Sequence, residues 1–464
     1  MWTSVRRRPG GSQKLTPKAN ELAHVDRLPV TRPLSSRARK GPIVLLLLLL
    51  SSTTISYIDR QTLSVAAPFI RPQFHMSSLD YSRVLFAFLL AYAVFNPIMG
   101  RFIDRIGTRR GLACSVGFWS VASMLHATAG SVWSLVFFRF LLGVGEAGNF
   151  PSCVRMVSEE IPADLRALAT GIFNMGAGLG AIIAPPAVAW LLMSYSWHAA
   201  FLFTGGIGFI WVLIWLMFYR PGRLRAGVKV LAGEEWSSTG APALPWRALF
   251  GYRQVWGLML ARFISDPAWY FYLFWLPEYL HSARGFNLQQ IGYFAWIPFL
   301  SADLGSFTGG WINTILMRRG VSLDKARKMV MSGSAACMPV AIVAAHVSDA
   351  ALAIALISLA TFAHQAWSAS MLTLPADLFP STVVASVCGL SAASSSFGAM
   401  IFMLAIGWVV DHFLYGPIFV TVGLMHPLAL GILFLTIPRI VMISLPSVDP
   451  EHKGKEDVGR ENSV

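Results

Sequence analysis

The segment GRFIDRIGTRRG, residues 100–111, has a second copy in the chain, GGWINTILMRRG at residues 309–320. The two segments align without a gap at a constant offset of 209 positions (309 minus 100). The matched pairs are Gly100 with Gly309, Asp104 with Asn313, Arg109 with Arg318, Arg110 with Arg319, and Gly111 with Gly320. Each copy follows the second of a series of long apolar segments. We therefore predict that the chain consists of two related halves, with this basic segment at the same place in each.

The apolar segments around the two copies indicate a membrane protein. The chain has 464 residues, of which 55% are hydrophobic and only 13% are charged, and its mean hydropathy is +0.58. Soluble domains carry about 25% charged residues, whereas a helix needs about 20 mainly apolar residues to cross a bilayer. We predict an all-α polytopic membrane protein with twelve transmembrane helices. Their approximate ranges are 43–70, 81–104, 110–129, 132–157, 166–195, 198–219, 253–281, 287–316, 326–346, 350–375, 382–411 and 415–438.

The order of the apolar segments divides the chain into five parts. Six segments precede the only long polar break and six follow it. The parts are a basic N-terminal arm at 1–42, a six-helix bundle at 43–219, a linker at 220–252, a second six-helix bundle at 253–440 and a polar tail at 441–464. Cytoplasmic loops are rich in Lys and Arg, and the number of segments is even. We therefore expect the arm, the linker, the tail and both termini on the cytoplasmic side.

The net charge of +14 does not indicate nucleic-acid binding. The basic residues are concentrated in the arm, around the linker and in short turns between apolar segments, as membrane orientation requires, and do not form one basic face. The chain also has no P-loop, no H-E-x-x-H motif and no C-x-x-C pair among its four cysteines. We expect no nucleic acid, metal or cofactor as a partner, and no enzymatic activity.

Residues 100–111 follow the pattern G-x-x-x-D-R-x-G-x-R-R and resemble the signature loop of the major facilitator superfamily. The residues of this loop are Gly100, Asp104, Arg105, Gly107, Arg109 and Arg110. Five more segments are similar to the anion:cation symporter family, and most of all to bacterial hexuronate transporters. They are SYIDRQTL (56–63), RFLLGVGEAGNFP (139–151), DPAWYFYLFWLPEYL (266–280), RRGVSLDKARK (318–328) and AHQAWSASMLTLPADLFP (363–380). The resemblance covers about residues 43–440. One departure is Asn313, where the family often has an acid, so a charge-based latch should be weaker in the second half.

The resemblance implies a proton-coupled symporter that imports a small anionic sugar acid by alternating access. A hexuronate such as galacturonate or glucuronate is the implied substrate, and an aldonate such as galactonate or another small organic anion remains open. The resemblance also implies a monomer in the lipid bilayer of the bacterial inner membrane. A membrane sensor that binds such an anion without transporting it is the alternative from a different class.

Asp59 and Arg60 lie side by side in the first apolar segment, where each charge costs about 2.5–3.5 kcal/mol at the centre of a lipid-exposed helix. Neighbouring residues of a helix point about 100° apart, so the two side chains serve different surroundings. Tyr57, Arg60 and Ser64 form one polar stripe. Because a guanidinium fits a carboxylate with two hydrogen bonds, we predict that Arg60 and Tyr57 bind the anionic substrate. A structural arginine paired with an acid of the protein is the alternative.

Asp59 and Glu146 are the predicted proton carriers. A carboxylate in a partly dehydrated cavity loses part of the solvation that favours its charged form, so it can gain and lose a proton. Glu146 shares a helix face with Arg139, and Gly143 between them allows a neighbouring helix to approach closely. We predict that Arg139 is the ionic partner that one acid releases on protonation, and the family resemblance implies the same roles. A static ion network between the first and fourth segments is the alternative.

Four other polar residues lie within apolar segments of either half. Tyr92 and Asn174 are candidates to hydrogen-bond a sugar hydroxyl, although each could equally be a packing residue. Arg262 and Asp266 stand four positions apart on one helix and are expected to pair with one another.

The second half has small and aromatic residues where the first has charges. At the offset of 209, Ala268 and Trp269 stand at the positions of Asp59 and Arg60. Aromatic faces can stack on a sugar ring, although Trp and Tyr near helix ends are usually interfacial. The residues predicted to bind the neutral body of the substrate are Trp269, Tyr272, Gln365, Trp367 and Ser368. His364 is expected to form a hydrogen bond, with a proton-carrying role as the alternative.

Overall fold

The structure is a computed structural model that describes residues 36–161, 166–219 and 246–443. Within these ranges every regular element is a helix. Most of the predicted arm, most of the linker and nearly all of the tail lie outside the described residues.

The described helices follow the predicted order in both halves. The first half contains α1 (Ser36–Gln73), α2 (Ser78–Ile106), α3 (Thr108–Leu125), the 3-10 turn η2 (His126–Thr128), α4 (Val132–Glu146), α5 (Asn149–Glu160), α6 (Arg166–Ser194) and α7 (Trp197–Phe218). A short helix, α9 (Trp246–Leu249), precedes the second half. The second half contains α10 (Arg253–Ser265), α11 (Pro267–Ser282), α12 (Leu288–Phe294), α13 (Ile297–Arg318), α14 (Leu323–Cys337), α15 (Val340–His346), α16 (Ala350–Met371), α17 (Leu374–Leu378), α18 (Ser381–Phe413) and α19 (Gly416–Thr436).

Each of the twelve predicted ranges contains one helix or two consecutive helices. Eight helical spans in the described residues are long and apolar enough to cross a membrane. The predicted ranges 110–129, 132–157, 253–281 and 287–316 are not among these eight, and the last three consist of two helices with a break between them. The protein is therefore a helical, multi-pass membrane protein, while the count of twelve crossings stays a prediction.

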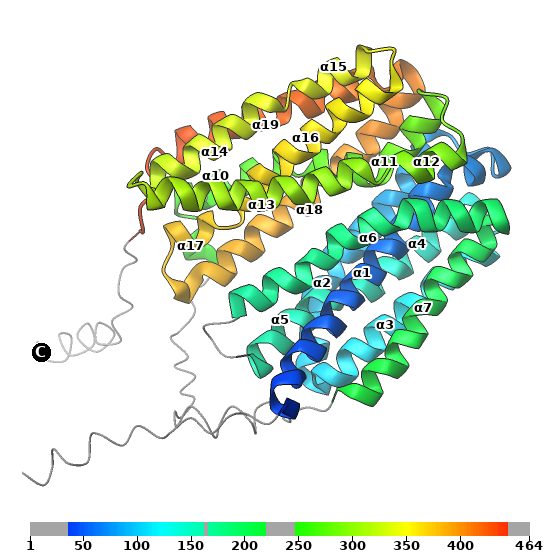
Figure 1. Cartoon of the computed structure of the whole chain (residues 1–464), viewed down its shortest axis with the longest axis horizontal. Helices are drawn as coiled ribbons and strands as arrows, with labels where there is room; N and C mark the ends of the chain where they lie inside the picture. The colour runs from blue at the N-terminus through cyan, green and yellow to red at the C-terminus, as the bar shows by residue number, and fades with distance from the viewer. Residues whose placement is uncertain (1–35, 162–165, 220–245, 444–464) are drawn as a thin grey trace, which may run out of the picture.

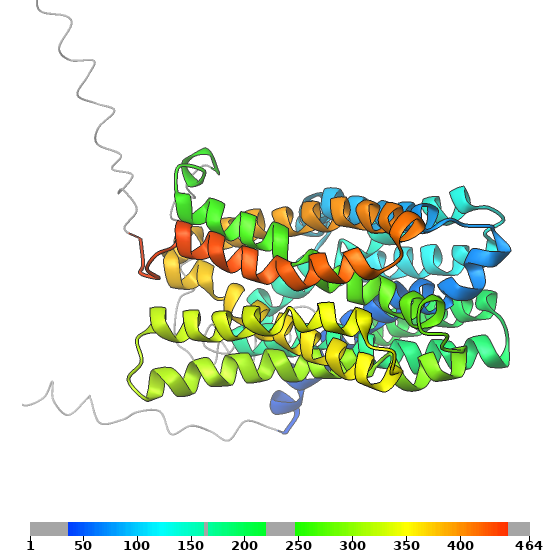
Figure 2. The same ribbon diagram turned by 90° about the horizontal axis from the view of Figure 1, so that it is seen from above.

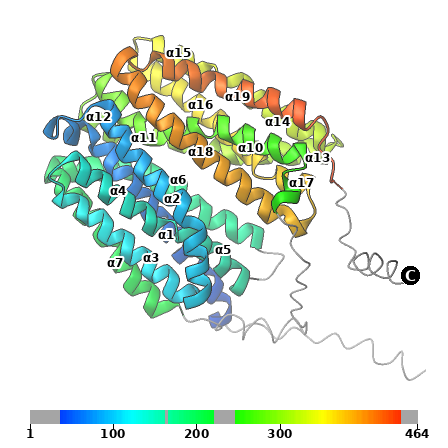
Figure 3. The same cartoon turned by 180° about the vertical axis from the view of Figure 1, so that it is seen from behind.

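The two halves lie side by side as two layers of helices (Figure 1). The view from above shows that the helices of both halves run in nearly the same direction, as a bundle across a membrane requires (Figure 2). Helices α2 and α18, α1 and α11, and α6 and α12 form contacts between the halves. The ribbons lie close together at the end that carries α11 and α12, and they diverge towards α5 and α17 (Figures 1 and 3).

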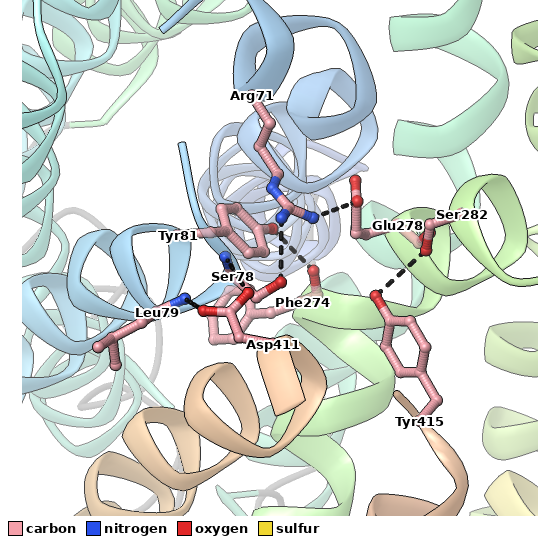
Figure 4. Close-up of polar contacts among 9 residues, drawn as sticks. All are labelled: Arg71, Ser78, Leu79, Tyr81, Phe274, Glu278, Ser282, Asp411 and Tyr415. Carbon is pink, nitrogen blue, oxygen red and sulfur yellow. Dashed lines mark hydrogen bonds and ion pairs between the residues drawn. The ribbon is translucent and has the colours of Figure 1, made fainter. Parts of the chain in front are cut away.

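Among the described residues, hydrogen bonds and an ion pair join the halves at one end, which we call the closed end (Figure 4). Arg71 at the end of α1 forms an ion pair with Glu278 of α11. Asp411 of α18 accepts hydrogen bonds from the backbone N–H groups of Ser78 and Leu79, at 2.8 and 3.0 Å. A carboxylate at this place is favoured because it satisfies the unpaired N–H groups at the N-terminus of α2.

Tyr81 completes the closed end, since its hydroxyl donates to the backbone oxygen of Phe274 at 2.8 Å (Figure 4). At the opposite end, the described residues form no ion pair between the halves. Within the described residues, polar contacts between the halves thus lie near α11 and α18.

Glycines of α6 bring this helix into direct contact with α1. A Cβ atom at Gly176 would lie 2.4 Å from the backbone oxygen of Leu50, and one at Gly180 would lie 2.6 Å from that of Thr54. This agrees with the expectation that small residues in an apolar helix serve close packing. Because α1 carries the charged residues, its contact with α6 fixes where they point.

The two copies of the repeated segment turn at different places. In the first half the turn is made by Gly107, which has a φ of +82°. In the second half it is made by Gly320, with a φ of +85°, although the gapless alignment places Leu316 opposite Gly107. The reason is that α13 continues to Arg318, beyond the point that corresponds to the end of α2. The halves are related, but this helix end is shifted.

Gly180→Ala is predicted to lower the midpoint temperature of unfolding of the detergent-purified protein. The added methyl group meets backbone and Cβ atoms of α1 that cannot move away locally, and overpacking of this kind costs about 1–3 kcal/mol. Gly206→Ala on α7 is the matched control, since a Cβ there meets nothing within 4 Å. Equal midpoints for the two variants would contradict the described α1–α6 contact.

Candidate functional site

Arg60 and Glu146 form an ion pair that joins α1 to α4. Nε of Arg60 donates to Oε2 of Glu146, and the hydroxyl of Ser56 donates to the same oxygen at 2.9 Å. Glu146 is fully buried and Arg60 is 6% exposed. The alternative in which Arg60 is paired with an acid of the protein therefore applies to this conformation. Removing one partner of such a pair is costly because it leaves an uncompensated charge.

The guanidinium of Arg60 retains two nitrogens for a further ligand. Nη1 and Nη2 donate to no acceptor within the described residues, and neither belongs to the buried unpaired atoms. The guanidinium carbon lies 4.6 Å from the ring centre of Tyr57, 5.0 Å from that of Phe88 and 4.8 Å from that of Tyr92. Aromatic faces stabilise a cation without using its hydrogen-bond donors. The site thus holds a positively charged group whose outer N–H groups are available.

Asp59 faces different surroundings from its neighbour, as predicted. Its Oδ1 accepts a hydrogen bond from the hydroxyl of Ser123 on α3 at 2.8 Å. The residue is fully buried, and its Oδ2 has no hydrogen-bond partner among the described residues. No cation forms an ion pair with this carboxylate there. A buried carboxylate without a cationic partner is much more favourable when it carries a proton.

Arg139 makes no ion pair with either acid in this conformation. Its Nη2 donates to the backbone oxygen of Arg60 at 2.6 Å, and its Nε and Nη1 have no partner in the described part of the chain. Glu146 is occupied by Arg60, and Asp59 by Ser123. The predicted release of Arg139 by a protonated acid would require another conformation and stays a prediction.

The cluster therefore contains two acids and two arginines but only one ion pair. Buried polar groups normally find partners, and a buried charge without one is costly. Arg139 and the Nη1 and Nη2 atoms of Arg60 carry positive charge with which an anion can pair, while Asp59 can accept a proton. An anion and a proton are the two ligands that would lower the energy of this arrangement.

The other predicted substrate residues differ in how exposed they are in this conformation. Trp269 of α11 is half-buried, and its ring is parallel to that of His364 on α16, with an interplanar angle of 6° and centres 5.8 Å apart. Gln365 and Ser368 of α16 are also half-buried. In the first half, Tyr92 is half-buried and Asn174 is exposed. His364 is buried, whereas the other side chains are at least partly exposed in this conformation, and the roles of all of them stay predictions.

Two predicted substrate residues are instead part of the protein core. Tyr272 and Trp367 are both 0% exposed, so neither can touch a ligand in this conformation. The reason is helical register. Tyr272 lies about 200° around α11 from Tyr270, and Trp367 lies about 200° around α16 from Gln365, which places both on the faces turned into the second half.

Tyr270 was missed by the sequence analysis. It is half-buried and stacks on Phe274 with ring centres 6.1 Å apart, and Phe274 packs edge-on against Phe88 with ring centres 6.3 Å apart. It therefore belongs to the aromatic group around Arg60, although it comes from the other half. Its position next to Trp269 was the available signal, but the break between α10 and α11 changes which face of the helix meets α1.

Asp303 of α13 was also missed. Its carboxylate lies against Gly178 of α6, where a Cβ atom would come within 2.0 Å of Oδ2. The side chain is half-buried and forms no hydrogen bond or ion pair with the described residues. The sequence does show an acid within this apolar helix, so Asp303 could have been selected as a candidate from the sequence. The structure places it at the contact between the halves.

Hydrogen bonds connect the signature loop, which includes the turn after α2, to α7. The backbone oxygen of Arg109 accepts a hydrogen bond from Nε1 of Trp215 at 2.9 Å, and the Arg109 guanidinium donates to the backbone oxygen of Leu216. Gly100 is half-buried, while Arg105 and Arg110 are exposed. The side chain of Asp104 lies outside the described residues.

Of two expectations for the second half, the pair of Arg262 and Asp266 is confirmed, while the weaker latch at Asn313 stays a prediction because the side chain of Asp104 is not described. Asn313, which replaces the acid of the first copy, donates to the hydroxyl of Ser370 on α16 at 2.9 Å, so an uncharged contact stands there. Arg262 and Asp266 form the expected pair, with 2.8 Å between Nε and Oδ2. Neither of these two is free to act as a simple substrate ligand.

Comparison with known proteins gives the same family. A model of the Major Facilitator Superfamily matches residues 49–323. The chain belongs to this superfamily. A hexuronate transporter of Escherichia coli K12 is 34% identical over 376 residues, which are 79% of this chain and 87% of that protein.

A D-galactonate transporter of Escherichia coli O6:H1 is 28% identical over 412 residues, or 85% of this chain and 95% of that one. The fold is similar to the crystal structure of a bacterial homologue of the lysosomal transporter Spinster in an inward-facing, unoccupied conformation. The TM-score is 0.68 at 18% identity, and the match covers 87% of this chain and 96% of that one. The predicted superfamily is therefore confirmed, and the protein is a transporter and not an enzyme.

Arg60→Met is predicted to lower the midpoint temperature of unfolding by more than the double variant Arg60→Met/Glu146→Gln. The single change leaves Glu146 buried without its cation, a loss of about 3–5 kcal/mol at most, whereas the double change removes both charges. Differential scanning fluorimetry on the purified protein measures the two midpoints. A double variant that is no more stable than Arg60→Met would contradict the described ion pair.

Proposed function

We propose that the protein is a proton-coupled symporter that imports a hexuronate, such as galacturonate or glucuronate, by alternating access. The observation that carries the proposal is the state of Arg60, which is held by Glu146 through Nε and keeps Nη1 and Nη2 available. Those two N–H groups match the two oxygens of a carboxylate. The hexuronate transporter that is 34% identical supports the same class of substrate.

Substrate and proton are coupled through Glu146. A substrate carboxylate on Arg60 competes with Glu146 for the same guanidinium, since both are anions. Protonation of Glu146 removes its negative charge, so Glu146 no longer competes with the substrate carboxylate for Arg60. A proton on Glu146 and an anion on Arg60 therefore favour one another, which is the thermodynamic requirement for symport.

Asp59 is the second proton carrier in this proposal. Its carboxylate is buried beside Ser123 and lacks a cation in this conformation. Protonation of Asp59 neutralises a buried negative charge next to the substrate-loaded site. The carrier can then reorient without that charge. Deprotonation on the cytoplasmic side then makes the charged form available to Arg139, whose Nε and Nη1 are unpaired.

The neutral body of the sugar acid lies against the second half. Trp269, Tyr270, Gln365 and Ser368 are the half-buried residues there that can contact it. The rings offer stacking faces, and the polar side chains offer hydrogen bonds to hydroxyl groups.

The conformation is inward-facing if both termini are cytoplasmic, as the basic arm and linker indicate. The closed end, with Arg71, Glu278 and Asp411, then faces the periplasm. The inner membrane of a bacterium is the proposed location, and the monomer the proposed functional unit. The positions of the arm and the tail lie outside the described residues.

An aldonate is the second candidate substrate, supported by the D-galactonate transporter that is 28% identical over 85% of this chain. An open-chain aldonate has the same carboxylate but no ring to stack on Trp269. A non-transporting sensor is the remaining alternative, and it would bind the acid without net flux.

Arg60→Lys is predicted to raise the KM for uptake of radiolabelled galacturonate into proteoliposomes by tenfold or more. Lysine keeps the charge but cannot hold Glu146 and a carboxylate with one planar fork, and the loss of about 1.4 kcal/mol corresponds to tenfold. Competition with glucuronate, galactonate and neutral galactose defines the substrate class. An unchanged KM in Arg60→Lys, or equal competition by galactose, would contradict the carboxylate assignment.

Asp59→Asn and Glu146→Gln are each predicted to abolish accumulation of galacturonate under an inward proton gradient, while exchange of external for internal galacturonate continues. Exchange needs reorientation of the loaded carrier only, whereas accumulation needs the proton to be released. The matched control is Ser368→Ala, which removes a hydrogen bond to the substrate and leaves the acids in place. Gradient-driven accumulation that survives in both acid variants would rule out these carriers.

A further inference from the structure

A pair of buried histidines lies in the second half, next to Trp269. His364 of α16 is 3% exposed and His426 of α19 is 0% exposed. Nδ1 of His364 and Nε2 of His426 are 3.0 Å apart, which is a hydrogen bond between the two rings. Neither ring forms an ion pair with a carboxylate in the described residues. Since an imidazolium in such a place would lack a counter-charge, both rings are neutral.

A hydrogen bond between two neutral imidazoles can be arranged in two ways. In the first, Nε2–H of His426 donates to Nδ1 of His364. In the second, Nδ1–H of His364 donates to Nε2 of His426, and the hydrogen of His426 then lies on its Nδ1. The two arrangements differ in what they leave unpaired, because each neutral ring has one donor and one acceptor.

The surroundings of His426 select the first arrangement. Its Nδ1 is buried and has no hydrogen-bond partner among the described residues, and the same is true of Nε1 of Trp367. Trp367 packs edge-on against His426, with ring centres 5.4 Å apart. The second arrangement would place a further buried N–H donor, on Nδ1 of His426, without an acceptor among the described residues, and an unpaired buried donor is unfavourable. The first leaves only a lone pair on Nδ1 of His426, and a buried acceptor without a partner is tolerated more readily than a buried donor without one.

The first arrangement leaves a hydrogen on Nε2 of His364. This nitrogen has no partner among the described residues, and it does not belong to the buried unpaired atoms, unlike Nδ1 of His426. The ring to which it belongs is parallel to Trp269, 5.8 Å away, and Trp269 is half-buried. An N–H donor therefore stands at the edge of a flat aromatic surface.

We infer that His364 donates Nε2–H to an oxygen on the neutral body of the substrate, and that His426 is a positioning residue that holds His364 in this tautomer. An acceptor such as a hydroxyl or ring oxygen, on a ligand that stacks on Trp269, fits this geometry. The inference rests on the proposed function, since it names a second contact for the same sugar acid. It assigns to His426, on a helix behind the site, a role in recognising a molecule that it never touches.

Matched variants separate the positioning role from simple packing. His426→Gln keeps an N–H donor that can reach Nδ1 of His364, while His426→Leu fills similar space and has none. We expect His426→Leu to raise the KM for galacturonate by about tenfold with little change in the maximal rate, in line with one lost hydrogen bond. We expect His426→Gln to remain within about twofold of the unchanged protein. Equal effects of the two variants, or an unchanged KM in both, would overturn the inference.

A second measurement does not depend on transport. The full chain, labelled with ¹⁵N-histidine and placed in lipid nanodiscs without substrate, reports the tautomer of each histidine by NMR. The signal of His364 is assigned by its loss in His364→Gln. We expect hydrogen on Nε2 in the unchanged protein and a mixture of tautomers in His426→Leu. Hydrogen on Nδ1 of His364 in the unchanged protein would overturn the inference.

The two measurements also separate this inference from the proposed function. If no sugar acid is taken up by the unchanged protein, the proposed function fails, and the NMR spectra alone still decide the tautomer of His364. If galacturonate is taken up but His364 has the other tautomer, the proposed function stands and the inference fails.

Discussion

The ion pair between Arg60 and Glu146 is the interaction on which the rest of the site depends. It uses one edge of the guanidinium, while Tyr57, Phe88 and Tyr92 surround its faces, so the remaining N–H groups have a fixed direction. The close contact of α6 with α1 through Gly176 and Gly180 holds the helix that carries Arg60. An arginine alone in this place would be too costly, and one fully paired with carboxylates would have nothing left to bind a ligand.

The charges are divided unequally between the halves, and the contacts between halves are divided unequally between the two ends. Asp59, Arg60, Arg139 and Glu146 all belong to the first half, whereas the second half contributes the ring of Phe274, whose centre lies 6.0 Å from the guanidinium carbon of Arg139. Among the described residues, the ion pair and the hydrogen bonds between the halves all lie at the closed end. The helix bundle is joined at one end, and its charged residues lie in one half. Alternating access requires that the contacts at the joined end can break while the charged site stays intact, and this arrangement allows it.

The sequence predicted the architecture well because apolar length, basic turns and an internal repeat depend on local composition. It also placed Asp59 and Arg60 in different surroundings, which follows from helical geometry alone. It did not predict which acid pairs with Arg60, because Glu146 is 86 positions away and the pairing depends on how α1 and α4 cross. Tyr272 and Trp367 were misplaced for a related reason, since each lies about 200° around its helix from a half-buried residue and so points into the core.

The measurement that tests the central claim most directly is the movement of protons with the sugar acid. Galacturonate is added outside weakly buffered proteoliposomes that have no initial pH gradient, and the external pH is followed. The account predicts that the external medium becomes more alkaline as galacturonate enters, and that Asp59→Asn removes this signal while exchange of labelled galacturonate continues. Entry of galacturonate without any change of external pH would contradict the account.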